Sequence, residues 1–149
     1  GMVKPALALS LHTTDAALRE KLLSRAPKIG IEELVERGET YARATGYPIQ
    51  YQWTLLAGIN DSEAEIDGIV RLLTGKYAVM NLIPYNSNEG LGFHRPDWGQ
   101  ARAMLRRLHQ RGILTKLRNS AGQDVDGGCG QLRARAEKKL TRALAIKPV

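Results

Sequence analysis

The residues best suited to covalent chemistry lie in one glycine-rich stretch, residues 123–131, which reads Gln-Asp-Val-Asp-Gly-Gly-Cys-Gly-Gln. It holds Cys129, the single cysteine among the 149 residues of the chain. The glycines beside Cys129 leave the thiol without neighbouring side chains, and they allow backbone angles that other residues avoid. Another molecule could therefore approach this thiol closely, as a covalent carrier requires. The alternative is that Cys129 is a small buried hydrophobic residue in a glycine turn.

The net positive charge of the chain indicates which kind of binding partner to expect. It carries 22 Lys and Arg residues against 15 Asp and Glu residues, a formal net charge of +7. Such an excess favours a polyanionic partner, with nucleic acid first and an anionic membrane second. The alternative is that the basic residues form a solvated helix surface. The late basic residues fall into two groups: Arg102, Arg106, Arg107, Arg111, Lys116 and Arg118, then Arg133, Arg135, Lys138, Lys139 and Arg142.

The number of cysteines and the lengths of the apolar runs indicate the cellular compartment of the protein. One cysteine cannot form an internal disulfide, so nothing points to secretion. No apolar run approaches the length of a membrane span, and the amino terminus has no signal-peptide pattern. We therefore expect a cytoplasmic protein without membrane contact.

Hydrophobic periodicity divides the chain into alternating strands and helices. Apolar or alternating runs predict four strands, at residues 6–12, 49–56, 79–83 and 113–118. Helical spacing predicts helices that begin at residues 16, 31, 63 and 98, followed by a basic helix over residues 131–144. Three of these starts carry capping signals: Asp15 before residue 16, Asp97 before residue 98, and Ser62 with Glu65, at capping-box spacing, around residue 63. Gly46 marks the end of the helix from residue 31. In the helix from residue 98, the residues expected to share one face are Trp98, Ala101, Leu105 and Leu108.

This order of elements predicts an α/β protein with a mainly parallel sheet. We expect one domain over residues 1–149, in which residues 131–149 form a basic carboxyl-terminal helix or tail. Four strands cannot close a barrel. The sheet should therefore have open edges that need another copy, a partner or more chain to cover them.

The strand over residues 49–56 has two unlike faces. Ile49, Tyr51, Trp53 and Leu55 fall on one face, and Gln50, Gln52 and Thr54 on the other. The apolar face should pack on helices, and the polar face could line a polar cavity. Ser10 and His12 end the first strand and Asn86 follows the third, so these side chains should meet at one rim, where α/β folds place their sites.

Four local sequences, taken together and in order, resemble one family. They are ALSLH at residues 8–12, GIND at 58–61, NLIPYN at 81–86 and DVDGGCGQL at 124–132. From about residue 6 to residue 132 the chain resembles the carboxyl-terminal half of the RlmN/Cfr family of radical S-adenosylmethionine enzymes. These methylate adenine at C2 or C8 in ribosomal RNA and, for RlmN, also in tRNA. The resemblance implies a partial (β/α) barrel with a mainly parallel sheet.

The resemblance also implies roles for five residues. Ser10, Leu11 and His12, at a strand end, would contact the S-adenosylmethionine cofactor, as would Asn86. Cys129 would be the catalytic methyl carrier, whose thiolate takes a methyl group from one cofactor molecule. In the family a second cofactor molecule is cleaved at a [4Fe-4S] cluster, and the resulting radical activates the methylated sulfur for addition to adenine in RNA.

The chain also departs from the family pattern. It has no CxxxCxxC motif to hold the [4Fe-4S] cluster, so we assign it no metal ligand, and it has no second cysteine to resolve the RNA adduct. Ala121-Gly122 replaces an Arg-Gly pair, and Gly127-Gly128 replaces Ala-Ala. We therefore expect a chain that is incomplete and inactive alone, with RNA and an N-terminal half or partner chain as its partners. A homodimer through the open sheet edge is a further expectation.

Two alternatives stay open. The first is a non-catalytic nucleotide- or RNA-binding module, or a relic of such an enzyme, that has lost the cluster-binding half. The second is a different enzyme class, in which Cys129 is the nucleophile and His12 its base. This last alternative requires the two residues to be near neighbours.

Overall fold

Four parallel strands, each beside the next one in sequence, form the sheet. The computed structural model describes residues 6–23, 29–86 and 92–118. The strands lie in the order β1-β2-β3-β4: β1 (Ala8–Ser10), β2 (Ile49–Leu55), β3 (Ala78–Pro84) and β4 (Thr115–Leu117). The helices are α1 (Ala16–Leu22), α2 (Ile31–Thr45), α3 (Glu63–Leu73) and α4 (Trp98–Gln110).

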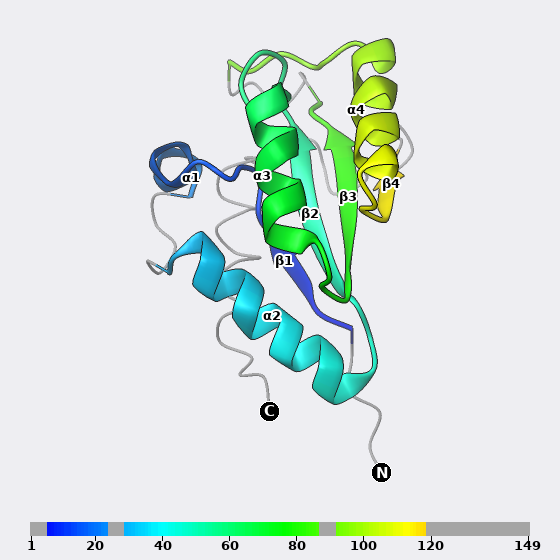
Figure 1. Cartoon of the computed structure of the whole chain (residues 1–149). Helices are drawn as coiled ribbons and strands as arrows, with labels where there is room; N and C mark the ends of the chain where they lie inside the picture. The colour runs from blue at the N-terminus through cyan, green and yellow to red at the C-terminus, as the bar shows by residue number, and fades with distance from the viewer. Residues whose placement is uncertain (1–5, 24–28, 87–91, 119–149) are drawn as a thin grey trace.

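The helices distinguish the two faces of the sheet. Figure 1 shows α2, α3 and α4 on the same side of the sheet. Sequential parallel strands with helices on one face are the arrangement of a (β/α) barrel segment. The predicted α/β class with a parallel sheet is therefore confirmed, as a partial barrel.

The outer edges of the sheet have no strand partner in the described part of the chain. Over residues 6–23, 29–86 and 92–118, β1 pairs only with β2, and β4 pairs only with β3. The described chain therefore does not close the sheet, as the strand count predicted. Among the described helices, none has the length and apolar character needed to cross a membrane.

Local sequence signals set most of the helix ends. The carboxylates of Asp15 and Asp97 accept hydrogen bonds from backbone N–H groups in the first turns of α1 and α4. Ser62 caps α3 in the same way. Gly46, with φ of 80°, ends α2 in the left-handed region that glycine adopts without a steric penalty. All four signals were predicted.

The apolar core lies between the helices and one face of β2. Ile49, Tyr51, Trp53 and Leu55 are buried in alternation with half-buried polar residues, as the sequence predicted. A Cβ atom on Gly38 would lie 2.7 Å from the Tyr51 hydroxyl oxygen. The absence of a side chain at Gly38 therefore lets α2 approach the sheet closely.

The buried stripe of α4 differs from the predicted one. Ala101, Met104 and Leu108 are buried, Leu105 is partly buried, and Trp98 is exposed. Met104 lies three residues after Ala101 and four before Leu108, so helical spacing places it on the same buried face as these two residues. Trp98 stands in the first turn, where its ring contacts a neighbouring arginine rather than the core.

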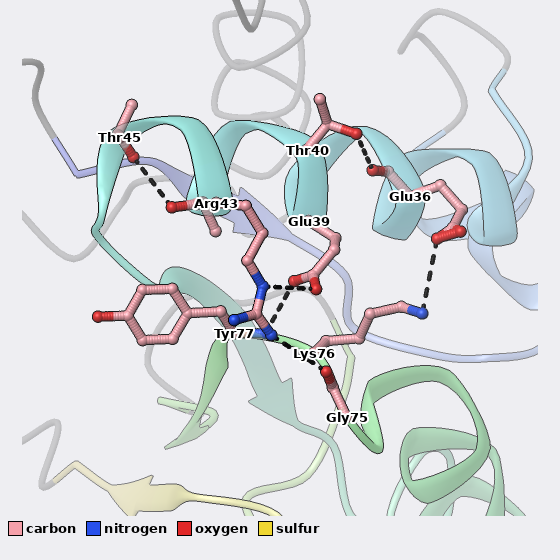
Figure 2. Close-up of polar contacts among 9 residues, drawn as sticks. Glu36, Glu39, Thr40, Arg43, Thr45, Gly75, Lys76 and Tyr77 are labelled. Atoms are coloured by element: carbon pink, nitrogen blue, oxygen red, sulfur yellow. Dashed lines mark hydrogen bonds and ion pairs between the residues drawn. The ribbon is translucent and has the colours of Figure 1, made fainter.

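At the amino ends of the strands, the loop before β3 is tied to α2 by a charged network (Figure 2). The Tyr77 backbone N–H donates to Glu39 Oε1 at 2.8 Å, and Arg43 Nε donates to Glu39 Oε2 at 2.9 Å. Arg43 also donates to the Gly75 carbonyl and lies 5.5 Å from the Tyr77 ring centroid. The Tyr77 hydroxyl donates to the Gly46 carbonyl. This end of the sheet is thus fixed by structural contacts, at the opposite end from the predicted site.

Candidate functional site

A row of polar side chains crosses the sheet on the face opposite α2, α3 and α4. Ser10 pairs in register with Gln52, Gln52 with Asn81, and Asn81 with Lys116. Registered partners in a parallel sheet point to the same face. Ser10 and Asn81 are fully buried, whereas Lys116 is exposed. The predicted polar face of β2 therefore continues across all four strands.

Asn81 links this row to its neighbours through its side-chain amide. Its Nδ2 donates to Gln50 Oε1 at 3.0 Å and to the Tyr51 carbonyl at 3.3 Å. Its Oδ1 accepts from Arg118 Nε at 3.3 Å. These contacts place a guanidinium cation over the polar face, next to β4. An anionic group that entered this face would be attracted to it.

Two buried side-chain atoms in the described chain, one at the carboxyl end of β1 and one on α1, lack hydrogen-bond partners. They are Ser10 Oγ and Arg19 Nε, and they alone have this property among the side chains of the described residues. Arg19 is 6% exposed, and its Nη2 donates to the Ser10 carbonyl at 3.3 Å. Burial lowers the pKa of the Arg19 guanidinium. Because most buried polar groups are paired, unsatisfied atoms here call for an explanation.

His12 has an unusual backbone and a fixed ring. Its φ of 62° lies in the left-handed region, which non-glycine residues adopt at a cost. The Thr54 backbone N–H donates to His12 Nδ1 at 2.9 Å. A backbone N–H can only donate, so Nδ1 carries no proton. The neutral ring therefore holds its proton on Nε2, where it is a hydrogen-bond donor.

Asn60 holds the backbone beside His12. Its Nδ2 donates to the carbonyls of His12 and Thr54, each at 2.8 Å, and its Oδ1 accepts from the Leu56 backbone N–H at 2.8 Å. Its own carbonyl accepts from Trp53 Nε1. Asn60 is fully buried. It therefore joins the turn after β2 to the loop after β1 and supports the left-handed conformation at His12.

Glu65 holds the same loop from the side of α3. The carboxylate accepts from the Thr14 backbone N–H at 2.7 Å, from Thr14 Oγ1 at 2.6 Å, and from the Thr13 hydroxyl. A Cβ atom on Gly68 would lie 2.2 Å from Thr14 Oγ1, so a residue without a side chain is needed there. The capping-box role expected for Glu65 is only half right. Ser62 accepts the Glu65 N–H, but the Glu65 carboxylate binds the loop after β1 instead.

The rim also receives the predicted residue Asn86. The Tyr85 backbone N–H donates to the Leu55 carbonyl at 3.0 Å, which extends the alignment of β2 and β3 past Pro84. Asn86 is half-buried one residue further along. Tyr85 packs edge-on against Phe93, with 5.7 Å between the ring centroids. Asn86 therefore lies at the same end of the sheet as Ser10 and His12, with β2 between them.

The remaining predicted residues have different outcomes. Leu11 is fully buried, its N–H donates to the Gln52 carbonyl and its carbonyl accepts from the Thr13 N–H. Cys129 and the predicted helix over residues 131–144 lie outside the described residues, so the roles assigned to them stay predictions. The same holds for a Cys129–His12 pair. Within the described ranges, no group of three His, Cys, Asp or Glu residues could hold a metal ion.

Known proteins give the site a context. No protein-family model matches the chain. It is 77% identical over 135 residues to a probable RNA methyltransferase of Aromatoleum aromaticum, covering 91% of this chain and 38% of the relative. It is 71% identical over 149 residues to a probable RNA methyltransferase of Methylibium petroleiphilum, covering 100% of this chain and 42% of the relative. The chain thus spans about two fifths of the length of these relatives.

Two solved structures share the fold. A radical SAM methyltransferase from Sphaerobacter thermophilus is 34% identical with a TM-score of 0.74, over 86% of this chain and 38% of that one. A domain of a pyruvate-formate lyase-activating enzyme from Bacteroides vulgatus is 16% identical with a TM-score of 0.60, over 76% of this chain and 66% of that domain. The second likeness concerns the fold alone. The radical SAM methyltransferase is similar to this chain in both fold and sequence.

Proposed function

We propose that this chain is the carboxyl-terminal part of a radical S-adenosylmethionine RNA methyltransferase of the RlmN/Cfr type. In this proposal the rim of the sheet binds S-adenosylmethionine, with Ser10, His12 and Asn86 as contacts, and Cys129 carries the methyl group. The substrate is an adenine of ribosomal or transfer RNA. Support comes from relatives named probable RNA methyltransferases and from the motifs that surround these residues.

The observation that carries the proposal is the unpartnered hydroxyl of Ser10. This side chain is fully buried at the carboxyl end of β1, and its Oγ has no hydrogen-bond partner in the described chain. A buried hydroxyl without a partner costs free energy, which a bound polar ligand would recover. S-adenosylmethionine offers ribose hydroxyls, a carboxylate and an amine. Ser10 fits a cofactor of this chemistry.

His12 and Leu11 would act in different ways. The Thr54 N–H donates to His12 Nδ1 and holds the His12 ring against β2, and from this position the ring would contact the cofactor. Both backbone groups of Leu11 are already bonded within the protein, and its side chain is buried. We infer that Leu11 anchors the strand end and thereby positions its two neighbours.

Cys129 would accept the methyl group as a thiolate. When bound, S-adenosylmethionine supplies an electrophilic methyl group on a sulfonium sulfur. The thiolate forms the new sulfur–carbon bond as the old one breaks, and the thiol proton leaves to solvent beforehand. The glycines around Cys129 would admit the cofactor and then the nucleotide.

The residues of this chain do not fit an iron–sulfur cluster. A [4Fe-4S] cluster is held by several cysteine thiolates, and the chain has one cysteine. No step of the proposal is therefore routed through a cluster held by these residues. The relatives are more than twice as long as the matching segment, and we propose that a further half or partner chain completes the site.

A chimera tests the proposal. In the Aromatoleum aromaticum relative, the part that matches this chain is replaced by residues 1–149, and peptide mass spectrometry then measures methylation at Cys129. We expect S-methylcysteine at Cys129 and methylated adenine in RNA, both lost in Cys129→Ser. A folded chimera with neither product, beside an active parent relative, would overturn the assignment.

A non-catalytic nucleotide- or RNA-binding module is the second candidate. It is favoured by the replacement of the family's arginine by Ala121. A chimera that binds S-adenosylmethionine and RNA but leaves Cys129 unmodified would support this candidate over the enzyme.

A further inference from the structure

Within the described chain, two arginines stack on aromatic rings, and only one of these pairs is locked into the fold. Arg43 lies over Tyr77, and both side chains are also held by the hydrogen bonds described above for the loop before β3. Arg102 lies 5.5 Å from the ring centroid of Trp98. Among the described residues, the Trp98 indole has no hydrogen-bond partner, and the residue is 36% exposed. The second pair therefore has a surface that the fold itself does not use.

The arginines of α4 and of its carboxyl end form two groups in the described chain, those that bind an acidic side chain and those that do not. Arg107 Nη2 donates to Glu63 Oε2 at 2.7 Å, and Arg111 Nη1 donates to Asp67 Oδ1 at 3.1 Å. These two bind α4 to α3. Among the described residues, Arg102 and Arg106 have no acidic partner, and both are exposed. The unpaired charges thus follow Trp98 at intervals of four residues.

The spacing places these three side chains on one face of α4. Residues four apart in a helix are neighbours on its surface. From Trp98 to Arg106 the helix rises about 12 Å, since each residue adds about 1.5 Å. That length corresponds to roughly three nucleotides of a stacked strand at about 3.4 Å per nucleotide.

The face begins beside the candidate site. Figure 1 shows that α4 starts at the end of the sheet toward which β3 points. The Ala57 N–H donates to the His94 carbonyl at 2.8 Å, which fixes the segment before α4 against the turn after β2. The exposed face therefore continues from the rim of the site along the outside of the helix.

We infer that Trp98, Arg102 and Arg106 form a docking surface for single-stranded RNA next to the methylation site. The inference rests on the proposed function for its RNA. A base stacks on the exposed ring of Trp98, as bases do on aromatic platforms. The two unpaired guanidinium groups bind the phosphates of the adjoining nucleotides. Paired Arg107 and Arg111 take no part.

Tryptophan fluorescence tests this directly, because Trp53 is fully buried and Trp98 is not. The probe is an oligouridylate of about ten nucleotides, within the usual site sizes for single strands. Titration into the 149-residue chain should quench Trp98. Trp98→Leu should weaken binding on the order of tenfold, measured by anisotropy of a labelled strand. Arg106→Gln should weaken binding and reduce the magnitude of the salt slope by about 0.7.

Arg107→Gln is the matched control, since it removes the same charge from the same helix. It should bind more tightly than Arg106→Gln. Equal affinities for the two variants, or wild-type affinity in Trp98→Leu, would overturn the inference, as would binding of an acidic peptide in place of RNA. A titration of S-adenosylmethionine into the chimera separates the two proposals. A chimera that binds RNA at Trp98 but does not bind S-adenosylmethionine would count against the proposed function. A chimera that binds S-adenosylmethionine but does not bind RNA at Trp98 would count against this docking surface.

Discussion

Replacing Asn60 with alanine tests whether the loop after β1 is held by the contacts described above. The side chain makes three hydrogen bonds of 2.8 Å, to the His12 carbonyl, the Thr54 carbonyl and the Leu56 N–H. Asn60 is fully buried, so water cannot replace these bonds without rearrangement. A net loss of about 1 kcal/mol for each bond gives a destabilisation of about 3 kcal/mol.

Urea denaturation followed by circular dichroism measures this loss. The midpoint should fall while the slope of free energy against urea stays constant, because the same surface is exposed on unfolding. Thr40→Ala is the control. It removes a single side-chain bond to the Glu36 carbonyl on the exposed face of α2 (Figure 2) and should change stability by at most about 0.5 kcal/mol.

A second measurement separates local from global effects. Asn60→Ala frees the backbone of His12, and the His12 ring should then lose its fixed tautomer, which nitrogen chemical shifts report. A destabilisation below about 1 kcal/mol with unchanged His12 shifts would refute the account of Asn60 as the support of His12.

Three further substitutions probe other contacts. Gly68→Ala should cost about 1–3 kcal/mol in urea denaturation, because its Cβ would lie 2.2 Å from Thr14 Oγ1, and an unchanged midpoint would contradict this packing. Burial raises the pKa of the Glu39 carboxyl, but the Tyr77 N–H and nearby cations outweigh this and hold the pKa below its ordinary value. The Glu39 carboxylate therefore stabilises the folded chain above about pH 4.3, and this stability is lost as the pH falls through the lowered pKa of the folded state. Glu39→Gln should be less stable than wild type at neutral pH, but not in strong acid. Burial, and then the nearby Glu39 and Glu36 carboxylates, raise the pKa of Tyr51. Stability from Tyr51 is thus present below about pH 10 and lost at higher pH, a loss that Tyr51→Phe should remove from a pH series of melts.

The sequence predicted those features of the fold that depend on neighbours along the chain. Caps at Asp15 and Asp97, the end of α2 at Gly46 and the alternation of β2 all follow from local chemistry. The parallel sheet followed from the order of these elements. Trp98 shows the limit of periodicity, which could not distinguish the first turn of α4 from its buried stripe.

The candidate site was only partly predictable, because its supports are distant in sequence. Ser10, His12 and Asn86 could be found at strand ends, but the contacts that hold the loop could not. Glu65 and Asn60 reach the loop across 52 and 48 residues, and a local pattern gave Glu65 a capping-box role. Nothing in the sequence indicated that Arg19 is buried beside Ser10.

Ser10→Ala tests whether the carboxyl end of β1 receives a ligand, as we propose. Without ligand, this variant removes a buried hydroxyl that lacks a partner, so it should be as stable as wild type or more stable by about 1 kcal/mol. In the chimera it should bind S-adenosylmethionine on the order of tenfold more weakly, as calorimetry would measure. Ser10→Ala that is less stable than wild type and binds the cofactor equally well would contradict the claim.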